Sequence, residues 1–155
     1  MVHQAKVITV SDGVADGTRD DRSGPILVAH LGAAGFEVID HVAVPDGVDS
    51  VAAAVVGACT GFAGLVVTTG GTGFGPRDLT PEGTLAAIER QAPGMAEAMR
   101  LVSPLGRLSR AVAGTIGAAL VLNTPGSTKG CVETLDAVLD AVPHALDLLA
   151  GQRPH

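Results

Sequence analysis

Residues 64–83 read GLVVTTGGTGFGPRDLTPEG, and this stretch decides the fold. The continuous apolar run 64–69 is typical of a strand buried on both faces of a parallel sheet. It passes directly into a glycine-rich loop at Gly70, and Thr80 and Pro81 then suit the N-cap and first turn of a helix. A buried strand, a loop and a helix in this order predict a β-α-β unit of an α/β protein.

Short β-branched runs alternate with longer Ala- and Leu-rich segments on both sides of this stretch. Further strands are expected at residues 6–10, 36–44 and 118–122, with a polar loop over 12–24. Helices are expected from an N-cap at Ser23 to a stop at Gly35, from Thr80 to a break at Pro93-Gly94, over 95–102, and over 132–149 with a kink or restart at Pro143. A helix is also expected over 48–59, where the many valines fit a strand as well. This alternation predicts a mainly parallel sheet.

The composition fits one folded domain over residues 1–155 and argues against several classes of function. Apolar residues make up 46% of the chain, so a core can form. The aromatic content of 2% argues against a surface that stacks on nucleic-acid bases. The formal charge of −6 argues against a basic surface that binds the phosphate backbone. Cys59 and Cys131 are isolated, as in a reducing compartment, and no apolar run has the length of a membrane span. We therefore expect a cytoplasmic protein with no nucleic-acid or membrane partner.

Four loops should meet where the parallel strands end, the edge at which open α/β sheets bind ligands. They begin at Ser11-Asp12, Pro45-Asp46, Gly70-Gly71 and Asn123-Thr124. In the glycine-rich loop, backbone N–H groups can converge on a phosphate, with a hydroxyl from Thr72, a positive charge from Arg77 and a Mg²⁺ ligand in Asp78. The alternative is a tight strand-to-helix turn without a ligand. Neither the Walker A pattern nor the Rossmann glycine pattern is present.

The loop NTPGSTKG, residues 123–130, offers a second set of phosphate-binding groups. Gly126 permits close approach, Ser127 and Thr128 carry hydroxyls, and Lys129 carries a positive charge. The alternative is a Pro-Gly turn followed by an N-cap. Turn formation is likewise the alternative for the aspartates of the first two loops, and Asp20-Asp21 is interpreted as a solvated pair. The five histidines show no metal-ligand spacing.

The string TTGGTGFGPRDLTPEGTLAAIE, preceded by VPDG and followed by LSRAVAG and NTPGS, closely resembles the MogA/MoaB family of molybdenum cofactor biosynthesis proteins. The resemblance implies an α/β three-layer fold with helices on both faces of the sheet, assembled as trimers or hexamers. The activity it implies is transfer of an adenylyl group from Mg-ATP to the terminal phosphate of molybdopterin, with release of pyrophosphate. Other molybdenum cofactor enzymes are the partners it implies.

The resemblance also assigns roles to residues. Asp78 and Asp46 match the family's important carboxylates and are the expected catalytic and Mg²⁺-holding pair. The substrate-binding residues that it implies are Ser11, Asp12, Gly70, Gly71, Thr72, Gly73, Ser103, Ser109, Pro125, Gly126 and Ser127. The chemistry of the two loops adds Arg77, Asn123 and Lys129 to the expected substrate-binding residues. Gly13 stands where many adenylyltransferases have Arg, and Gly83 replaces a usual Ala at a helix position where Gly costs about 1 kcal/mol. The alternatives are therefore a non-catalytic molybdopterin-binding or assembly protein and, less well supported, a generic nucleotidase.

Overall fold

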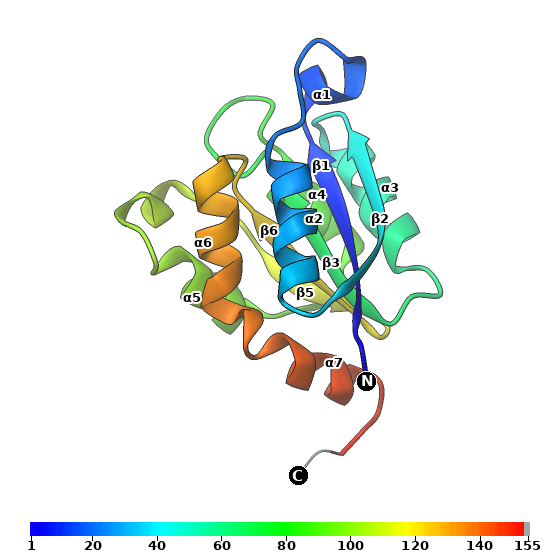
Figure 1. Cartoon of the computed structure of the whole chain (residues 1–155). Helices are drawn as coiled ribbons and strands as arrows, with labels where there is room; N and C mark the ends of the chain where they lie inside the picture. The colour runs from blue at the N-terminus through cyan, green and yellow to red at the C-terminus, as the bar shows by residue number, and fades with distance from the viewer. Residues whose placement is uncertain (154–155) are drawn as a thin grey trace.

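A single six-stranded sheet organises the chain in the computed structural model, which describes residues 1–153 (Figure 1). Its strands are β1 (Gln4–Val10), β2 (Glu37–Val44), β3 (Gly64–Thr69), β4 (Arg90–Gln91), β5 (Ala113–Ile116) and β6 (Ala119–Thr124), in the order β2-β1-β3-β6-β5-β4. The first four strands in this order are parallel, and β5 and β4 join antiparallel. The prediction of a mostly parallel sheet is confirmed.

Helices cover both faces of the sheet, which confirms the three layers. Helices α2 (Ser23–Ala33), α5 (Pro93–Arg100), α6 (Thr128–Leu139) and α7 (Val142–Leu149) pack on one face, and α3 (Val48–Cys59) and α4 (Thr80–Ala87) pack on the other. Neighbouring residues of one strand serve opposite faces, as Leu65 does with the first group and Val66 with the second. A five-residue helix α1 (Asp12–Asp16) and a 3-10 helix η1 (Pro104–Leu108) lie outside these layers. No helix among residues 1–153 is long and apolar enough to cross a membrane.

The central strands carry polar residues at their carboxyl ends even though every residue of β3 and β6 is buried. Thr68, Thr69, Asn123 and Thr124 are fully buried. Burying hydroxyl and amide groups is costly unless each finds a hydrogen-bond partner. This end of the sheet therefore holds an organised polar layer directly beneath the loops.

The expected loop and cap positions differ from the structure in three places. Residues 12–16 of the expected loop form α1, because the Ser11 hydroxyl accepts a hydrogen bond from the Val14 N–H at 3.3 Å. Ser23 is the first helical residue, and the N-cap is Arg22, which makes no side-chain cap hydrogen bond. The Gly24 N–H in the first turn donates instead to Asp21 Oδ1 at 3.0 Å. Thr80 is likewise the first residue of α4, without a side-chain cap hydrogen bond.

The expected helix boundaries around the two prolines also change. Helix α4 ends at Ala87, and Pro93 begins α5, where its missing N–H costs nothing. The expected restart near Pro143 is confirmed, since α6 ends at Leu139 and α7 begins at Val142. Strands β4 and β5, of two and four residues, were not expected.

Gly83 has a packing reason inside α4. A Cβ at this position would lie 2.6 Å from Val51 Cβ and 2.8 Å from the Val48 carbonyl oxygen. Real Cβ atoms do not approach other atoms so closely, so glycine allows α3 and α4 to pack against each other. Glycine lowers the stability of the helix itself by about 1 kcal/mol relative to alanine, and the close packing of α3 on α4 offsets this loss.

Candidate functional site

Two adjoining cavities open at the edge of the sheet where the parallel strands end. The first, of about 520 Å³, lies between the 99–111 segment and the start of α6. The second, of about 410 Å³, lies over the ends of β1 and β3 beside residues 19–23. Gly71, Asp78, Gly126 and Ser127 line both cavities. Two adjoining cavities with shared walls are suited to two ligands that meet at those residues.

The glycine-rich loop is held tightly against the sheet. Gly70 and Gly71 have φ of +102° and +69°, a region that favours glycine. A Cβ at Gly70 would run into the Val10 carbonyl oxygen, and one at Gly71 would run into the Thr80 hydroxyl. That hydroxyl donates to the Gly70 carbonyl at 2.9 Å, and the Thr80 N–H donates to the Gly71 carbonyl at 3.0 Å. The loop conformation therefore depends on glycine at both positions.

Two further glycines make room for the Asp78 carboxylate. Its Oδ2 accepts a hydrogen bond from the Gly75 N–H at 2.9 Å. A Cβ at Gly73 or at Gly75 would lie 3.0 Å or 2.8 Å from the same oxygen. The carboxylate is thus oriented by the loop and lies on the boundary of both cavities. This position fits its expected catalytic role, which stays a prediction.

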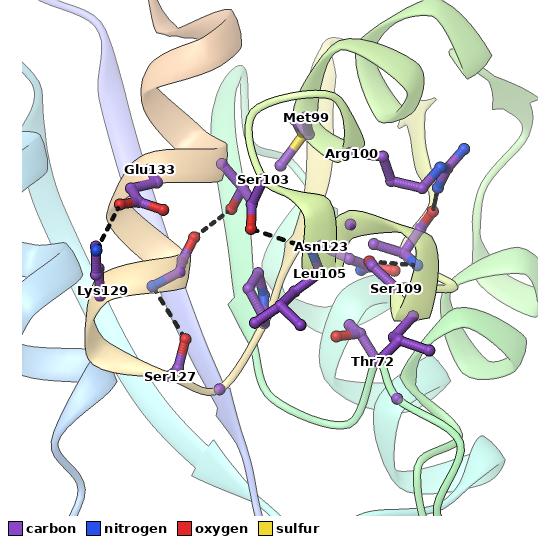
Figure 2. Close-up of a pocket in the computed structure, with 18 of the residues that line it drawn as sticks. Thr72, Met99, Arg100, Ser103, Leu105, Ser109, Asn123, Ser127, Lys129 and Glu133 are labelled. Atoms are coloured by element: carbon purple, nitrogen blue, oxygen red, sulfur yellow. Dashed lines mark hydrogen bonds and ion pairs between the residues drawn. The ribbon is translucent and has the colours of Figure 1, made fainter.

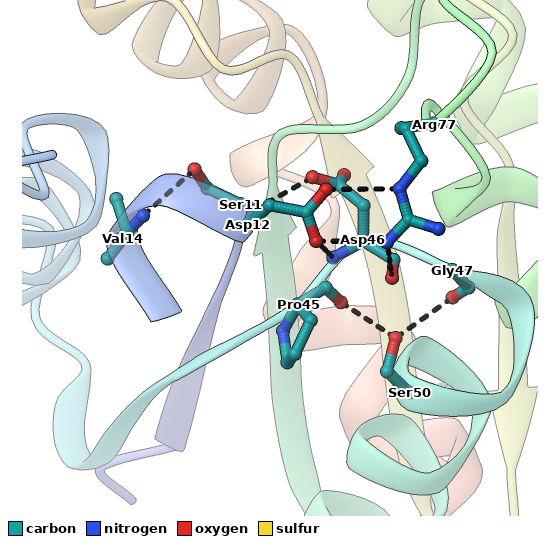
Figure 3. Close-up of polar contacts among 8 residues, drawn as sticks. All are labelled: Ser11, Asp12, Val14, Pro45, Asp46, Gly47, Ser50 and Arg77. Carbon is teal, nitrogen blue, oxygen red and sulfur yellow. Dashed lines mark hydrogen bonds and ion pairs between the residues drawn. The ribbon is translucent and has the colours of Figure 1, made fainter. Parts of the chain in front are cut away.

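Asp12, Asp46 and Arg77 join the first two loops to the glycine-rich loop (Figure 3). The Asp12 N–H donates to Asp46 Oδ2 at 2.9 Å, and the Asp46 N–H donates to Asp12 Oδ1 at 3.1 Å. Arg77 donates to both Asp12 carboxylate oxygens at 3.1 and 3.0 Å and to the Asp46 carbonyl at 2.9 Å. The Arg77 guanidinium was expected to hold an anion, but in this arrangement its charge is matched by Asp12.

The pKa values of the Asp12 and Asp46 carboxyls shift in opposite directions within this cluster. Hydrogen bonds from Arg77 hold the pKa of the Asp12 carboxyl below its ordinary value. Burial raises the pKa of the Asp46 carboxyl, and the neighbouring Asp12 and Asp78 carboxylates raise it further. Asp46 is therefore a partly desolvated anion next to a second carboxylate. Such a site attracts cations.

Asn123 organises the floor beneath the loops. Its amide nitrogen donates to the hydroxyls of Thr68 at 2.9 Å and Thr84 at 3.0 Å, and its Oδ1 accepts from the Val112 N–H at 3.1 Å. The side chain is fully buried, and both of its N–H donors are used inside the protein. Asn123 lines the first cavity as expected, but the structure gives its side chain a bracing role.

The second loop combines both interpretations that its sequence allowed. Ser127 is the N-cap of α6, with its Oγ accepting from the Gly130 N–H at 3.0 Å, and it also lines both cavities. Gly126 lies close to the glycine-rich loop, and the Pro125 carbonyl accepts from the Thr69 hydroxyl at 2.9 Å. Lys129 is 85% exposed and forms an ion pair with Glu133 at 3.6 Å. The two expected anion-binding loops therefore lie side by side.

The first cavity has an apolar wall opposite this loop (Figure 2). Met99, Leu105 and Leu108 line it together with the expected serines Ser103 and Ser109. Thr72 lines the same cavity and is buried. The Ser103 hydroxyl accepts from the Leu105 N–H and the Ser109 hydroxyl accepts from the Ala111 N–H, both at 3.2 Å. Apolar and hydroxyl-bearing walls together suit a flat heterocycle that carries polar edges.

Arg110 is the main site residue that the sequence did not single out. The Arg110 guanidinium donates to the carbonyls of Gly73 and Asp78 and to the Glu82 carboxylate. The backbone N–H of Arg110 donates to the Thr72 carbonyl. Arg110 therefore ties the glycine-rich loop from behind. A lone Arg in LSRA gives no sequence signal for this role, because its contacts with Gly73 and Asp78 join residues 37 and 32 positions apart.

A second missed cluster lies beside the second cavity. Asp21, interpreted as solvated, accepts a hydrogen bond from the Thr9 hydroxyl at 2.8 Å and pairs with His41 Nε2 at 3.1 Å. Residues 1–153 contain no group of three His, Cys, Asp or Glu side chains that would hold a metal by themselves. Any cation at Asp46 and Asp78 must therefore share its ligands with a substrate or with water.

Comparisons with known proteins identify the family of this chain. Residues 6–144 match a family model described as a probable molybdopterin binding domain. The chain is 35% identical over 152 residues to a molybdopterin adenylyltransferase of Helicobacter pylori (strain J99), covering 94% of this chain and 86% of that one. The structure superposes with a TM-score of 0.89 on the molybdopterin biosynthesis enzyme MoaB of Thermus thermophilus, with 41% identity and coverage of 97% and 98%. It gives the same TM-score with the molybdopterin biosynthesis Mog protein of Mycobacterium ulcerans, with 38% identity and coverage of 98% and 99%. The chain therefore belongs to the MogA/MoaB family of molybdenum cofactor biosynthesis proteins.

Proposed function

We propose that this protein transfers the adenylyl group of Mg-ATP to the terminal phosphate of molybdopterin and releases pyrophosphate. The observation that carries the proposal is the position of Asp78, on the boundary between two cavities that meet at the glycine-rich loop. Asp46 also lines the second cavity. Two anionic substrates bound side by side would bring their reacting phosphates together at this boundary.

The reaction needs charge neutralisation more than it needs a base. An oxygen of the pterin's phosphate monoester forms a bond to the α-phosphorus of ATP, and the bond from that phosphorus to the α,β-bridging oxygen breaks. The electron pair leaves with pyrophosphate. A phosphate monoester is largely dianionic at neutral pH, since its second pKa is about 6, so no protein group has to remove a proton. No histidine lines either cavity among the described residues, which is consistent with this chemistry.

The residues present fit a Mg²⁺ ion that arrives with the nucleotide. Protein-bound Mg²⁺ is often held by one or two carboxylates together with substrate phosphates and water. Asp46 and Asp78 supply the two carboxylates at the second cavity. When bound there, the ion would offset the negative charge that builds up on the transferring phosphoryl group.

The chain's own groups then position the substrates. In the glycine-rich loop, the N–H groups of Gly71, Thr72 and Gly73 donate to no other described residue, so they are available to phosphate oxygens. Arg77 and Arg110 hold that loop in place through their hydrogen bonds. Met99, Leu105 and Leu108 offer an apolar face to the pterin ring in the first cavity. From the family resemblance we also infer a cytoplasmic location and assembly as a homotrimer or hexamer. Light scattering on the purified protein measures its molar mass and so tests the assembly.

The direct test mixes purified protein with Mg-ATP and molybdopterin and measures pyrophosphate and adenylylated pterin. We expect molybdopterin-dependent product. We expect Asp78→Asn to lower the rate by about 100-fold or more, since removing one preorganised electrostatic group from such a site costs about 3 kcal/mol of transition-state stabilisation. Asp140→Asn removes an exposed carboxylate at the end of α6, away from both cavities, and should leave the rate unchanged. Full activity of Asp78→Asn would refute the role of Asp78.

A second candidate function is molybdopterin binding without catalysis. Gly13 favours it, because no side chain projects from the residue that follows Ser11-Asp12. Saturable pterin binding in the absence of any pyrophosphate release would establish this alternative. ATP consumption without molybdopterin would instead point to a nucleotidase.

A further inference from the structure

Most of the positive charges around the candidate site are already matched inside the protein. Arg77 is bound to Asp12, Arg110 is bound to Glu82, and Lys129 pairs with Glu133. Arg19 and Arg22 line the second cavity and are exposed. Within residues 1–153, neither of these two guanidinium groups has a hydrogen bond or an ion pair. They are therefore the positive charges that this cavity offers to a ligand.

Gly13 lies directly against Arg19. The Gly13 carbonyl accepts from the Thr18 N–H at 2.9 Å and from the Arg19 N–H at 3.0 Å, so the chain after α1 folds back over this residue. A Cβ at Gly13 would lie 3.0 Å from Arg19 Cβ and 3.6 Å from Arg19 Cδ. The first contact is tighter than normal, so a side chain at residue 13 requires Arg19 to shift by a few tenths of an ångström.

The segment between the two arginines is anchored. Asp21 accepts from the Thr9 hydroxyl at 2.8 Å, pairs with His41 at 3.1 Å and accepts from the Gly24 N–H at 3.0 Å. A Cβ at Gly24 would collide with all three of these side chains, so glycine is required there. The backbone at Arg19 is held by the Gly13 carbonyl, and the backbone next to Arg22 is held by the bonds of Asp21. A backbone that is already ordered reduces the entropy lost when the two arginine side chains bind an anion.

The second cavity needs such cations. Four carboxylates line it, from Asp20, Asp21, Asp46 and Asp78, and the whole chain has a formal charge of −6. A triphosphate entering this cavity meets like charge unless cations on the protein and on the ligand offset it. Guanidinium groups are well matched to phosphate because they donate two parallel hydrogen bonds.

We propose that Arg19 and Arg22 bind the β- and γ-phosphates of the nucleotide and hold the pyrophosphate that leaves. This proposal rests on the proposed adenylyl transfer for the identity of the ligand. It gives Gly13 a role in catalysis: the cation that the site needs comes from residue 19, and a side chain at residue 13 would shift that residue. The departure at Gly13 is therefore compatible with a catalytic site.

The test measures binding of inorganic pyrophosphate to the full chain by calorimetry in the presence of Mg²⁺. We expect Arg19→Ala and Arg22→Ala each to weaken binding about tenfold, the usual value of a charge-assisted hydrogen-bonded pair. Gly13→Ala should weaken it by about threefold, and it should add nothing in the Arg19→Ala background, because both changes act through one side chain. Arg90→Ala removes an exposed arginine from β4, the outermost strand on the side of the sheet away from β2 and β1. This variant loses the same charge outside the second cavity and serves as the control.

The outcomes separate this proposal from the proposed function. If pyrophosphate binding depends on Arg19 but not on Arg90, the arginine site stands even when no adenylylated product forms. If product forms while Arg19→Ala binds pyrophosphate within twofold of the unchanged chain, the adenylyl transfer stands and the arginine site is overturned. An equal loss in Arg90→Ala would also overturn it, since the effect would then be one of net charge alone.

Discussion

The two sides of the first cavity are built in different ways. On one side, the loops after β3 and β6 lie on fully buried Thr68, Thr84 and Asn123, whose hydrogen bonds join separate elements of the fold. On the other side, Leu105 and Leu108 of the 101–109 segment are 72% and 54% exposed. Hydrogen bonds such as those from the Gly106 and Ser109 N–H groups stay within that segment.

This difference matches the chemistry of the proposed ligands. Phosphate transfer depends on fixed positions, and a preorganised polar site has little to reorganise when the ligand binds. An apolar ring can be held by a surface that is less constrained, because apolar contacts are not directional. We therefore expect substitutions on the loop side to change stability strongly, and substitutions in the 101–109 segment to change binding alone.

The largest expected effect on stability is at Asn123. Asn123→Leu keeps the approximate size of the side chain but removes the bonds to Thr68, Thr84 and the Val112 N–H. We expect the free energy of unfolding to fall by about 3 kcal/mol, since a buried donor is left without its acceptor. Urea denaturation measures this loss, and a change below about 1 kcal/mol would show that the polar layer does not brace the loops.

The next effect is at Thr80, whose hydroxyl donates to the Gly70 carbonyl. Thr80→Val keeps the shape and removes that bond, and we expect a loss of about 1–2 kcal/mol in the same denaturation experiment. Thr60→Val is the matched control, because the exposed Thr60 hydroxyl also donates to a backbone carbonyl, that of Val56 at 2.7 Å. Equal losses in both variants would contradict a special role for the loop side.

A smaller effect of opposite sign is expected at Asp46. Burial raises the pKa of its carboxyl, so the native state at pH 7 holds this group in a charged form that its surroundings disfavour. Asp46→Asn should therefore increase the free energy of unfolding at pH 7 while it removes the proposed activity. The difference from the unchanged protein should disappear as the pH falls through the carboxyl's pKa, because both side chains are then neutral. Chemical denaturation at a series of pH values checks this, and a destabilised variant at pH 7 would contradict it.

The sequence predicted those parts of the fold that depend on long local patterns. The structure places β3 at Gly64–Thr69, the expected residues, because a continuous apolar run is a strong signal. Helix α3 also has the expected bounds, Val48–Cys59, although its many valines fit a strand as well as a helix. Strand β4 has two residues, and a pair of residues forms a strand only through its antiparallel partner. No local pattern could therefore have indicated it.

The same limit applies to the site. Glycine spacing and the RD pair indicated the loop at Gly70 and the carboxylate of Asp78, which the structure places at one cavity boundary. The pairing of Arg77 with Asp12 joins residues 65 positions apart, so the local sequence could suggest only a free cation. Arg19 was missed for a related reason, because its position follows from the turn over Gly13 and from the anchors of Asp21.

The smallest effect on stability is expected in the 101–109 segment, and it decides whether the two sides really differ. Leu105→Ser replaces a side chain that is 72% exposed and lines the first cavity, so the free energy of unfolding should change by less than about 0.5 kcal/mol. Molybdopterin affinity should nevertheless fall about fivefold, because the pterin loses an apolar contact. Leu85→Ser on α4, where Leu85 is 43% exposed and lines neither cavity, should change neither quantity. If Leu105→Ser destabilised the fold by as much as Thr80→Val, the 101–109 segment would be part of the same braced structure as the loops. The contrast between a rigid phosphate side and an adaptable pterin side would then fail.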